Sequence, residues 1–395
     1  MMMLARTVME DGMRLLALVD SPDHVCCRYR IRAFEPALRD AGCSLVCQPL
    51  ERYFLPRLTQ LRDASRYHAV ILQRKLLPSW QLALLRRHAR HLIFDFDDAV
   101  LYRDSYDRRG PHSARRERRF AATVRLADTV IAGNDFLADC ALRAGAAAES
   151  VRTIPTCVDP IRYLPRTERP TERGERPIEL VWIGSSSTLK GLESQRTLWE
   201  RLGGAIPGLR LRVVCDRFPD FQGVEVVPVP WTESNEAAEL ARGDLGVSWL
   251  PDDDWSRGKC GLKILQYQAA GLPTIANPVG AHVEMIEPGA TGFLASTPDQ
   301  WIEAVRAAAD PAFRAEMGRA ARSRVETHYS IAAWAPTFVA SATGVDHQGS
   351  SSLRCGWSDA RPAAPTPFVF RRRANHEPEP PARAVSPEQP RREQD

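Results

Sequence analysis

The sequence predicts an α/β protein in which two parallel sheets, each with helical crossovers, follow one another along the chain. Short apolar runs alternate with amphipathic segments through most of the first 340 residues, a pattern typical of parallel sheets whose strands are joined by helices. The alternation stops in a stretch rich in Pro, Arg, Glu and Thr, which predicts a linker at 161–177. A length of 395 residues also fits two domains better than one.

The first half predicts an N-terminal domain over residues 1–160. Apolar runs predict strands at 15–19, 44–48, 69–72, 92–96, 129–132 and 150–154. Amphipathic stretches predict helices at 31–41, 79–90, 113–127 and 136–144.

The second half predicts a domain over residues 178–325. Strands are expected at 178–183, 210–214, 224–227, 245–250 and 274–277, and helices from about Lys190 and at 235–241, 260–270, 299–308 and 311–340. A closing helix over 326–343 is expected to pack back on the first domain. Pro, Arg, Glu and Ser dominate 344–395, which predicts a disordered tail.

Composition narrows the class of protein. The net charge of +4 is small and its sources are spread along the chain, which argues against a dedicated nucleic-acid binder. Nine cysteines without CxxC or Cys/His ligand spacing predict buried thiols in a reducing compartment. The first twelve residues carry Glu10 and Asp11 and no apolar core region, so we expect no signal peptide. The sequence also has no apolar run of the ~18–20 residues that a membrane span requires. We expect a soluble cytoplasmic protein, with peripheral contact to the inner face of the membrane left open.

Lysine is scarce. Only four of the 53 basic residues are lysines, namely Lys75, Lys190, Lys259 and Lys263. Under a bias that favours Arg, a surviving Lys can mark a need for a compact ammonium group, although four chance survivors are the simpler alternative.

A glycine-containing loop at 257–261 includes Lys259 and leads into a helix that is expected to open at Cys260 and that carries Lys263. Backbone N–H groups at a helix start attract anions, and Lys259 and Lys263 are spaced to share a face of the first turn. Cations there oppose the helix dipole unless an anion offsets them, so the pattern predicts a diphosphate site. The alternative is a pair of solvated surface lysines.

The segment 255–292 resembles the donor-site region of glycosyltransferase family 4, retaining enzymes of the GT-B fold with two Rossmann-like domains facing a cleft. The matching elements are Gly261-Leu262, Leu265-Gln266-Tyr267, Ala269-Ala270-Gly271-Leu272-Pro273-Thr274, Gly280, Glu284-Met285-Ile286 and Gly289-Ala290-Thr291-Gly292-Phe293-Leu294. A second match places Lys190 six residues after Gly184, with Ser185 where the family commonly has Arg.

The resemblance implies transfer of a sugar from a nucleotide-sugar to an acceptor hydroxyl, with retained configuration and no required metal. The nucleotide-sugar is a substrate, so no cofactor is implied. The acceptor would be a carbohydrate, a lipid-linked precursor or a small molecule, as in polysaccharide synthesis for the cell envelope. The implied donor-binding residues are Gly184, Ser185, Ser186, Lys190, Lys259, Gly261, Leu262, Lys263, Gln266 and Glu284.

One departure opens another interpretation. The family's paired glutamates, which have seven residues between them, fall on Gly258 and Gln266. Gln266 can still exchange hydrogen bonds but carries no charge. Asp252, Asp253 and Asp254 either replace the lost carboxylate or form an exposed acidic loop. The alternative function is therefore a non-catalytic nucleotide-sugar-binding scaffold. A nucleotide-sugar epimerase on the same fold is a third interpretation, but the sequence offers no clear acid–base pair for that reaction.

The N-terminal half supplies the candidate catalytic residues. Asp97 and Asp98 follow an expected strand and are candidates to orient an acceptor hydroxyl or stabilise charge on the sugar. A metal-binding D-x-D site and a simple capped strand end are the alternatives.

Other polar groups follow expected strands of this half. Arg28 and Arg30 are candidates for an anionic acceptor or the donor phosphates, with a surface role as the alternative. Lys75 follows the third strand. His24 and His282 lie near the expected cleft without a decided role.

Overall fold

The computed structural model describes residues 12–165 and 177–344. Within them the chain forms two six-stranded sheets in which neighbouring strands are parallel, with the orders β2-β1-β3-β4-β5-β6 and β12-β11-β10-β7-β8-β9. The expected α/β class with two Rossmann-like sheets is confirmed. Residues 166–176 of the expected linker and 345–395 of the expected tail lie outside the described residues.

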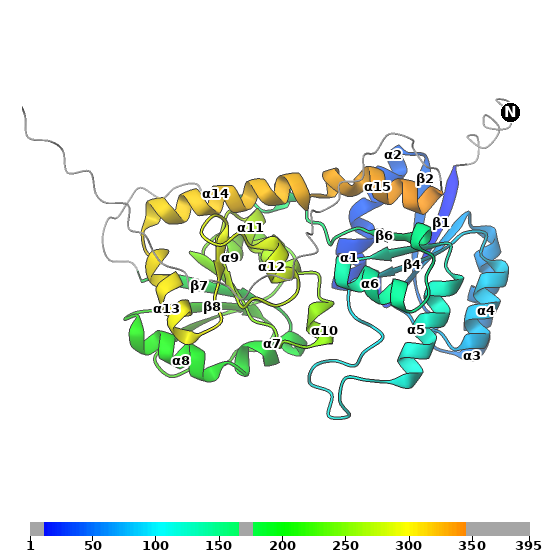
Figure 1. Ribbon diagram of the computed structural model, residues 1–395. Helices are drawn as coiled ribbons and strands as arrows, with labels where there is room; N and C mark the ends of the chain where they lie inside the picture. Colours follow the sequence, from blue (N-terminus) through cyan, green and yellow to red (C-terminus); the bar gives the residue numbers. More distant parts are fainter. Residues whose placement is uncertain (1–11, 166–176, 345–395) are drawn as a thin grey trace, which may run out of the picture. The chain divides into compact units, whose positions relative to one another are not determined.

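The first sheet and its helices form the N-lobe (Figure 1). Its strands are Met13–Val19 (β1), Cys43–Pro49 (β2), Ala69–Gln73 (β3), Leu92–Phe96 (β4), Thr129–Ala132 (β5) and Val151–Thr153 (β6). Its helices are Val25–Arg30 (α1), Glu35–Asp40 (α2), Phe54–Asp63 (α3), Ser79–His88 (α4), Ala114–Leu126 (α5) and Asp135–Arg143 (α6), with short 3-10 turns at Arg32–Phe34 (η1), Ala64–Arg66 (η2), Ala148–Ser150 (η3) and Pro160–Arg162 (η4). One apolar core lies between the sheet and α3–α6, and another lies between the sheet, α1, α2 and the last helix, Ile331–Thr343 (α15).

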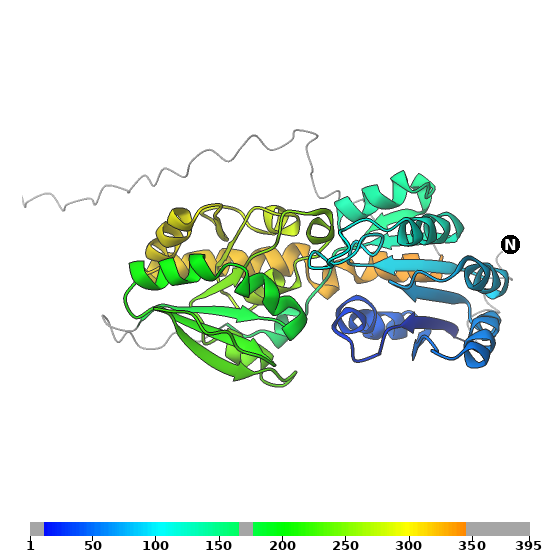
Figure 2. The same cartoon turned by 90° about the horizontal axis from the view of Figure 1, so that it is seen from below.

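The second sheet and its helices form the C-lobe. Its strands are Glu179–Ile183 (β7), Arg210–Cys215 (β8), Glu225–Pro230 (β9), Leu245–Ser248 (β10), Thr274–Ala276 (β11) and Gly292–Leu294 (β12). Its helices are Ser186–Glu193 (α7), Arg196–Ala205 (α8), Glu236–Leu240 (α9), Asp254–Arg257 (α10), Leu262–Ala269 (α11), Ala281–Met285 (α12), Pro298–Ala307 (α13) and Pro311–His328 (α14). One core involves α7, α8 and α13, and the other involves α9, α11 and α12, so helices cover both faces of the sheet (Figure 2).

Strand β4 shows how the sequence places polar residues at one edge of the N-lobe sheet. Side chains alternate along a strand, so Phe94 and Phe96 pack in the α3–α6 core while Ile93 packs on the other face. All strands of the sheet are parallel, so the loops that follow them meet at one edge, which we call the carboxyl edge. Asp97 and Asp98 follow β4 directly and therefore lie at this edge.

Two helix starts differ from the expectation because turn residues set them. The helix expected from about Lys190 begins at Ser186, since Ser185 occupies the N-cap position and its N–H donates to Thr188 Oγ1. The helix expected at 260–270 begins at Leu262, since Gly261 has a φ of 62° that glycine adopts readily. Lys259 therefore precedes the helix and does not share its first turn with Lys263.

The last helical stretch is interrupted. Helix α14 ends at His328, and Ser330 Oγ caps α15 by accepting a hydrogen bond of 3.2 Å from the N–H of Ala333. Helix α15 packs on the N-lobe, where Phe338 stacks on Phe34 with ring centroids 4.2 Å apart. No helix among residues 12–165 and 177–344 is long and apolar enough to cross a membrane.

Candidate functional site

A charged cluster lies at the carboxyl edge of the N-lobe sheet. Asp97 and Asp98 follow β4, and Arg74 follows the neighbouring strand β3. Arg74 Nη2 donates to a carboxylate oxygen of Asp98, and its Nε lies 3.5 Å from Oδ1 of Asp97. In the described part of the chain, Arg74 is the one non-glycine residue with a positive φ, 58°. Such strained conformations concentrate at functional sites.

His24 faces the same cluster from the N-terminus of α1, where its Nδ1 accepts a hydrogen bond of 3.3 Å from the N–H of Cys26. Partial burial and the charge of Arg74 lower the pKa of His24, while Asp97 and Asp98 act in the opposite direction. The structure thus brings His24 together with both predicted aspartates.

The loop before α11 contacts this cluster. Asn134 caps α6, and its Nδ2 donates to the carbonyl oxygens of Arg257 and Lys259 at 3.3 and 3.2 Å. The Nζ of Lys259 lies 3.6 Å from Oδ1 of Asp98. Burial raises the pKa of Asp98, although Lys259 and Arg74 pull it down. Asp98 therefore joins a cation from each lobe.

Lys259 and Lys263 lie close together with their ammonium groups over indole rings. Lys259 Nζ is 5.2 Å from the ring centroid of Trp255, and Lys263 Nζ is 4.6 Å from that of Trp182. Burial and the charge of Lys259 lower the pKa of Lys263 to about 7. Gly261 offers no side chain to cap the N–H groups of the first turn of α11. A bound anion would stabilise both ammonium groups and these N–H groups.

The predicted Gly184 turn lies beside this lysine pair. A Cβ at Gly184 would lie 2.4 Å from the ring of Trp182, the ring under Lys263. Lys190, in contrast, is exposed on α7, with its Nζ 5.9 Å from the ring centroid of Tyr106.

The predicted Ser185 and Ser186 stabilise the start of α7. The N–H of Ser185 donates to Thr188 Oγ1 at 3.2 Å, and the N–H of Ser186 donates to Oδ1 of Asp216 at 2.7 Å. An anion at this helix start would compete with the carboxylate of Asp216.

Glu284 and His282 on α12 differ in their protonation. Burial and the nearby Asp135 of α6 raise the pKa of Glu284 to about 7. His282 is buried between Ser248 Oγ at 3.0 Å and the carbonyl oxygen of Asn277 at 2.8 Å, and burial lowers its pKa to about 4. His282 is therefore a neutral structural residue, whereas Glu284 changes charge near neutral pH.

Gln266 lies in a buried network. Its Nε2 donates to the hydroxyl groups of Tyr29 and Tyr163 at 3.2 Å each. Both tyrosine hydroxyls donate to Oε1 of Glu236, at 2.9 and 2.6 Å. For Gln266 to contact a donor, as the sequence predicts, this network would have to rearrange.

Gly258, at the other glutamate position, packs against the N-lobe. A Cβ there would lie 2.6 Å from the Cβ of Ala99. The site therefore has no room for a side chain at position 258 in this structure.

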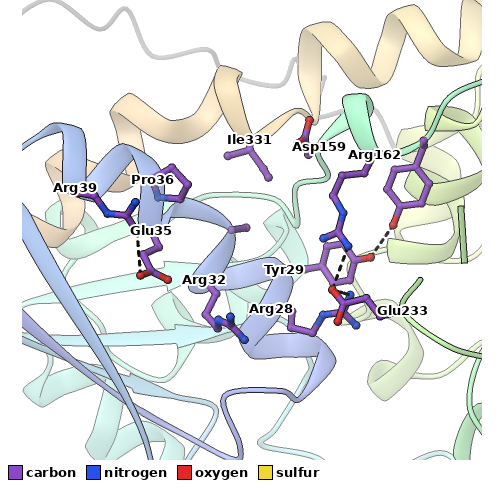
Figure 3. Close-up of a pocket in the computed structure, with 12 residues that line it drawn as sticks. Arg28, Tyr29, Arg32, Glu35, Pro36, Arg39, Asp159, Arg162, Glu233 and Ile331 are labelled. Carbon is purple, nitrogen blue, oxygen red and sulfur yellow. Dashed lines mark hydrogen bonds and ion pairs between the residues drawn. The ribbon is translucent and has the colours of Figure 1, made fainter. Parts of the chain in front are cut away.

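The two candidate arginines on α1 have separate environments. Arg28 lies 2.8 Å from Oε1 of Glu233 and lines a cavity of about 260 Å³, together with Arg32, Glu35, Arg39 and Arg162 among others (Figure 3). Arg30 is buried, with its Nη2 2.6 Å from Oδ1 of Asp95. The expectation that Arg30 binds an acceptor does not agree with this burial, which gives it a structural role.

Comparison with known proteins agrees with this architecture. Residues 194–340 match the model of the family described as glycosyl transferase-like. Sucrose-phosphate synthase from Thermosynechococcus elongatus is similar over 82% of this chain and 97% of its own, with a TM-score of 0.63 and 17% identity. A glycosyltransferase from Rickettsia africae gives a TM-score of 0.60 at 13% identity, over 83% of this chain and 97% of its own. Anabaena HepE in complex with UDP-glucose gives a TM-score of 0.59 at 14% identity, over 83% of this chain and 98% of its own.

The chain has the GT-B fold. No curated protein matches it significantly in sequence. On this GT-B framework, the structure brings together the predicted Asp97, Asp98, Lys259 and Lys263, and it places Gly184, Gly261 and Leu262 beside the lysines.

Sequence reasoning missed Arg74, Tyr29 and Glu236. Arg74 carries no signal in a chain with 49 arginines, whereas the scarcity of lysine distinguishes its neighbour Lys75, which pairs with Asp20. Tyr29 and Glu236 are 207 residues apart and meet only through the fold.

Proposed function

We propose that the chain is a glycosyltransferase that moves a sugar from a nucleotide-sugar to an acceptor hydroxyl. The observation that carries the proposal is the pair Lys259 and Lys263 at the uncapped start of α11, where burial and mutual repulsion favour a bound anion. The family match over 194–340 includes both lysines, and HepE, with the same fold, was determined with UDP-glucose.

The residues of this site have distinct proposed roles. Lys259 and Lys263 stabilise the negative charge that develops on the leaving diphosphate. Glu284 orients hydroxyl groups of the donor, and Asp97 and Asp98 orient the acceptor hydroxyl. Membership of glycosyltransferase family 4, retention of configuration, metal independence and an acceptor from cell-envelope polysaccharide synthesis belong to the same proposal.

We also propose a cytoplasmic location. The eight cysteines among the described residues are free thiols, which supports a reducing compartment.

A non-catalytic nucleotide-sugar-binding scaffold is the second candidate. Two observations favour it: Gly258 has no room for the family's carboxylate, and the amide of Gln266 is engaged by Tyr29 and Tyr163. Under this alternative the lysine pair binds a nucleotide without turnover.

Calorimetry with UDP, GDP and their sugars, together with a product assay, separates the candidates. We expect binding, sugar transfer, and loss of both in Lys259→Ala/Lys263→Ala. Arg201→Ala is a matched control because Arg201 forms an exposed ion pair with Asp299, remote from the lysines in sequence. Binding without product on any acceptor favours the scaffold, and unchanged turnover in the double variant refutes the diphosphate assignment.

A further inference from the structure

A group of large apolar side chains is exposed on the N-lobe. Tyr53, Phe54 and Leu55, at the start of α3, are 76%, 60% and 71% exposed, and Trp80, at the start of α4, is 49% exposed. The rings of Phe54 and Trp80 lie 5.7 Å apart between centroids. These four residues therefore form one surface, which we call the apolar patch.

The apolar patch lies at the carboxyl edge of the N-lobe sheet. Helices α3 and α4 follow the parallel strands β2 and β3, so their N-terminal ends lie at the edge where Asp97 and Asp98 follow β4. Trp80 is six residues after Arg74, which binds both aspartates. The patch and the charged cluster thus share one edge of the lobe.

The helices that carry the patch and their neighbour α5 are strongly basic. Together α3, α4 and α5 contain nine arginines against two acidic residues, Asp63 and Glu117, although the whole chain carries only +4. The sources of charge are spread along the chain, but these three helices carry an excess of basic residues.

The positive charge of α5 is not neutralised by carboxylates. Within residues 12–165 and 177–344 no arginine of α5 forms an ion pair. Arg116 donates instead to the carbonyl oxygens of Val100 and Tyr102, and Arg119 to that of Leu76. Arg115 and Arg118 are exposed. Helix α5 packs against α4, and α4 packs against α3. Cationic groups on α5, together with exposed aromatic and aliphatic side chains at the starts of α3 and α4, match the chemistry of an anionic bilayer surface.

We propose that the apolar patch and the arginines of α5 dock the N-lobe on an anionic lipid bilayer. Tyr53 and Trp80 suit the headgroup layer, and Phe54 and Leu55 suit the acyl boundary below it. RNA binding would use the arginines but gives no reason for an exposed Leu55. The docking goes beyond the proposed glycosyl transfer; combined with it, the docking brings a lipid-anchored acceptor toward Asp97 and Asp98.

The test is co-sedimentation of the full chain with vesicles of phosphatidylcholine alone or with 30% phosphatidylglycerol. We expect salt-sensitive binding to the anionic vesicles, weakened at least about tenfold in Phe54→Ala/Leu55→Ala/Trp80→Ala. Arg115→Gln/Arg118→Gln should remove the preference for anionic lipid. Ile161→Ala/Phe218→Ala is the matched control, since both residues are exposed, at 79% and 41%, outside the patch.

Thermal melting of each variant confirms folding, and nucleotide calorimetry reports the donor site separately, so failure of one proposal does not imply failure of the other. The docking proposal is overturned if the wild-type chain stays in the supernatant with anionic vesicles, or if the triple variant binds them as the wild type does. Binding to single-stranded RNA but to neither vesicle would equally overturn it.

Discussion

The Asp98 carboxylate of the N-lobe lies 3.6 Å from the Lys259 ammonium group of the C-lobe. Lys259 is also the cation that, after burial, lowers the pKa of Lys263. Asp98 therefore supplies part of the negative charge that the lysine pair attracts, and under the proposed function a donor diphosphate would have to compete with it.

Replacement of Asp98 by Asn tests this competition. Removal of the charge frees Lys259 from its ion pair, so we expect UDP to bind about two- to fivefold more tightly. We also expect the rate of sugar transfer to fall about tenfold or more, because the acceptor loses an orienting carboxylate. Calorimetry and steady-state rates measure the two effects. Asp107→Asn is the control, since Asp107 pairs with its neighbour Arg109; unchanged affinity and rate in Asp98→Asn would contradict both roles.

Donor binding should take up a proton through Lys263. Its pKa of about 7 in the free protein leaves it largely neutral at pH 8, and a bound diphosphate favours the charged form and raises the pKa. We expect uptake of about one proton at pH 8, and affinity that weakens as pH rises above 7. Calorimetry in two buffers of different ionisation enthalpy measures the uptake.

Glu284 also has a pKa of about 7, so a bound anion would favour proton uptake by its carboxylate as well. The Lys263→Met variant separates proton uptake by Lys263 from proton uptake by Glu284. Uptake that persists undiminished in the methionine variant would remove Lys263 from the anion site.

Substitution of Gly258 tests the contact with Ala99. We expect Gly258→Ala to lower the free energy of unfolding by about 1–3 kcal/mol, because the new Cβ would overlap with Ala99. Gly204→Ala, in α8, is the matched control: no atom lies within 4 Å of its Cβ position, so stability should rise by about 0.5–1 kcal/mol. Urea unfolding compares the two, and an equal response at both sites would argue against close packing at Gly258.

Gln266→Glu restores the residue that the family resemblance leads one to expect. The new carboxylate would be buried close to Glu236. Each hydroxyl of Tyr29 and Tyr163 has one proton, which it already donates to Glu236, so the new carboxylate would lack hydrogen-bond donors. We expect a loss of about 1–3 kcal/mol in unfolding free energy, against little change in the exposed control Gln222→Glu. A variant as stable as the wild type, with faster sugar transfer, would instead show that Gln266 reaches the donor.

The strands were predictable because burial on both faces requires continuous apolar runs; β4 and β5 have the expected bounds. Strand β12 was missed because it has three residues and begins with glycine. Helix α3 was missed because Pro56 and a low apolar content obscure its period. Helix starts at Ser186 and Leu262 depend on turn geometry that a periodic pattern does not contain.

By itself, the sequence determined the α/β class and the order of the two lobes, and it singled out Lys259 and Lys263 as candidates, because apolar periodicity and lysine scarcity are local properties. Only the tertiary structure decided which charges meet. It paired Asp98 with Lys259 and Arg74, buried Arg30 against Asp95, and enclosed Gln266 between two tyrosines. These contacts join residues far apart in the chain, and their energies depend on distance and burial, which only the folded chain sets.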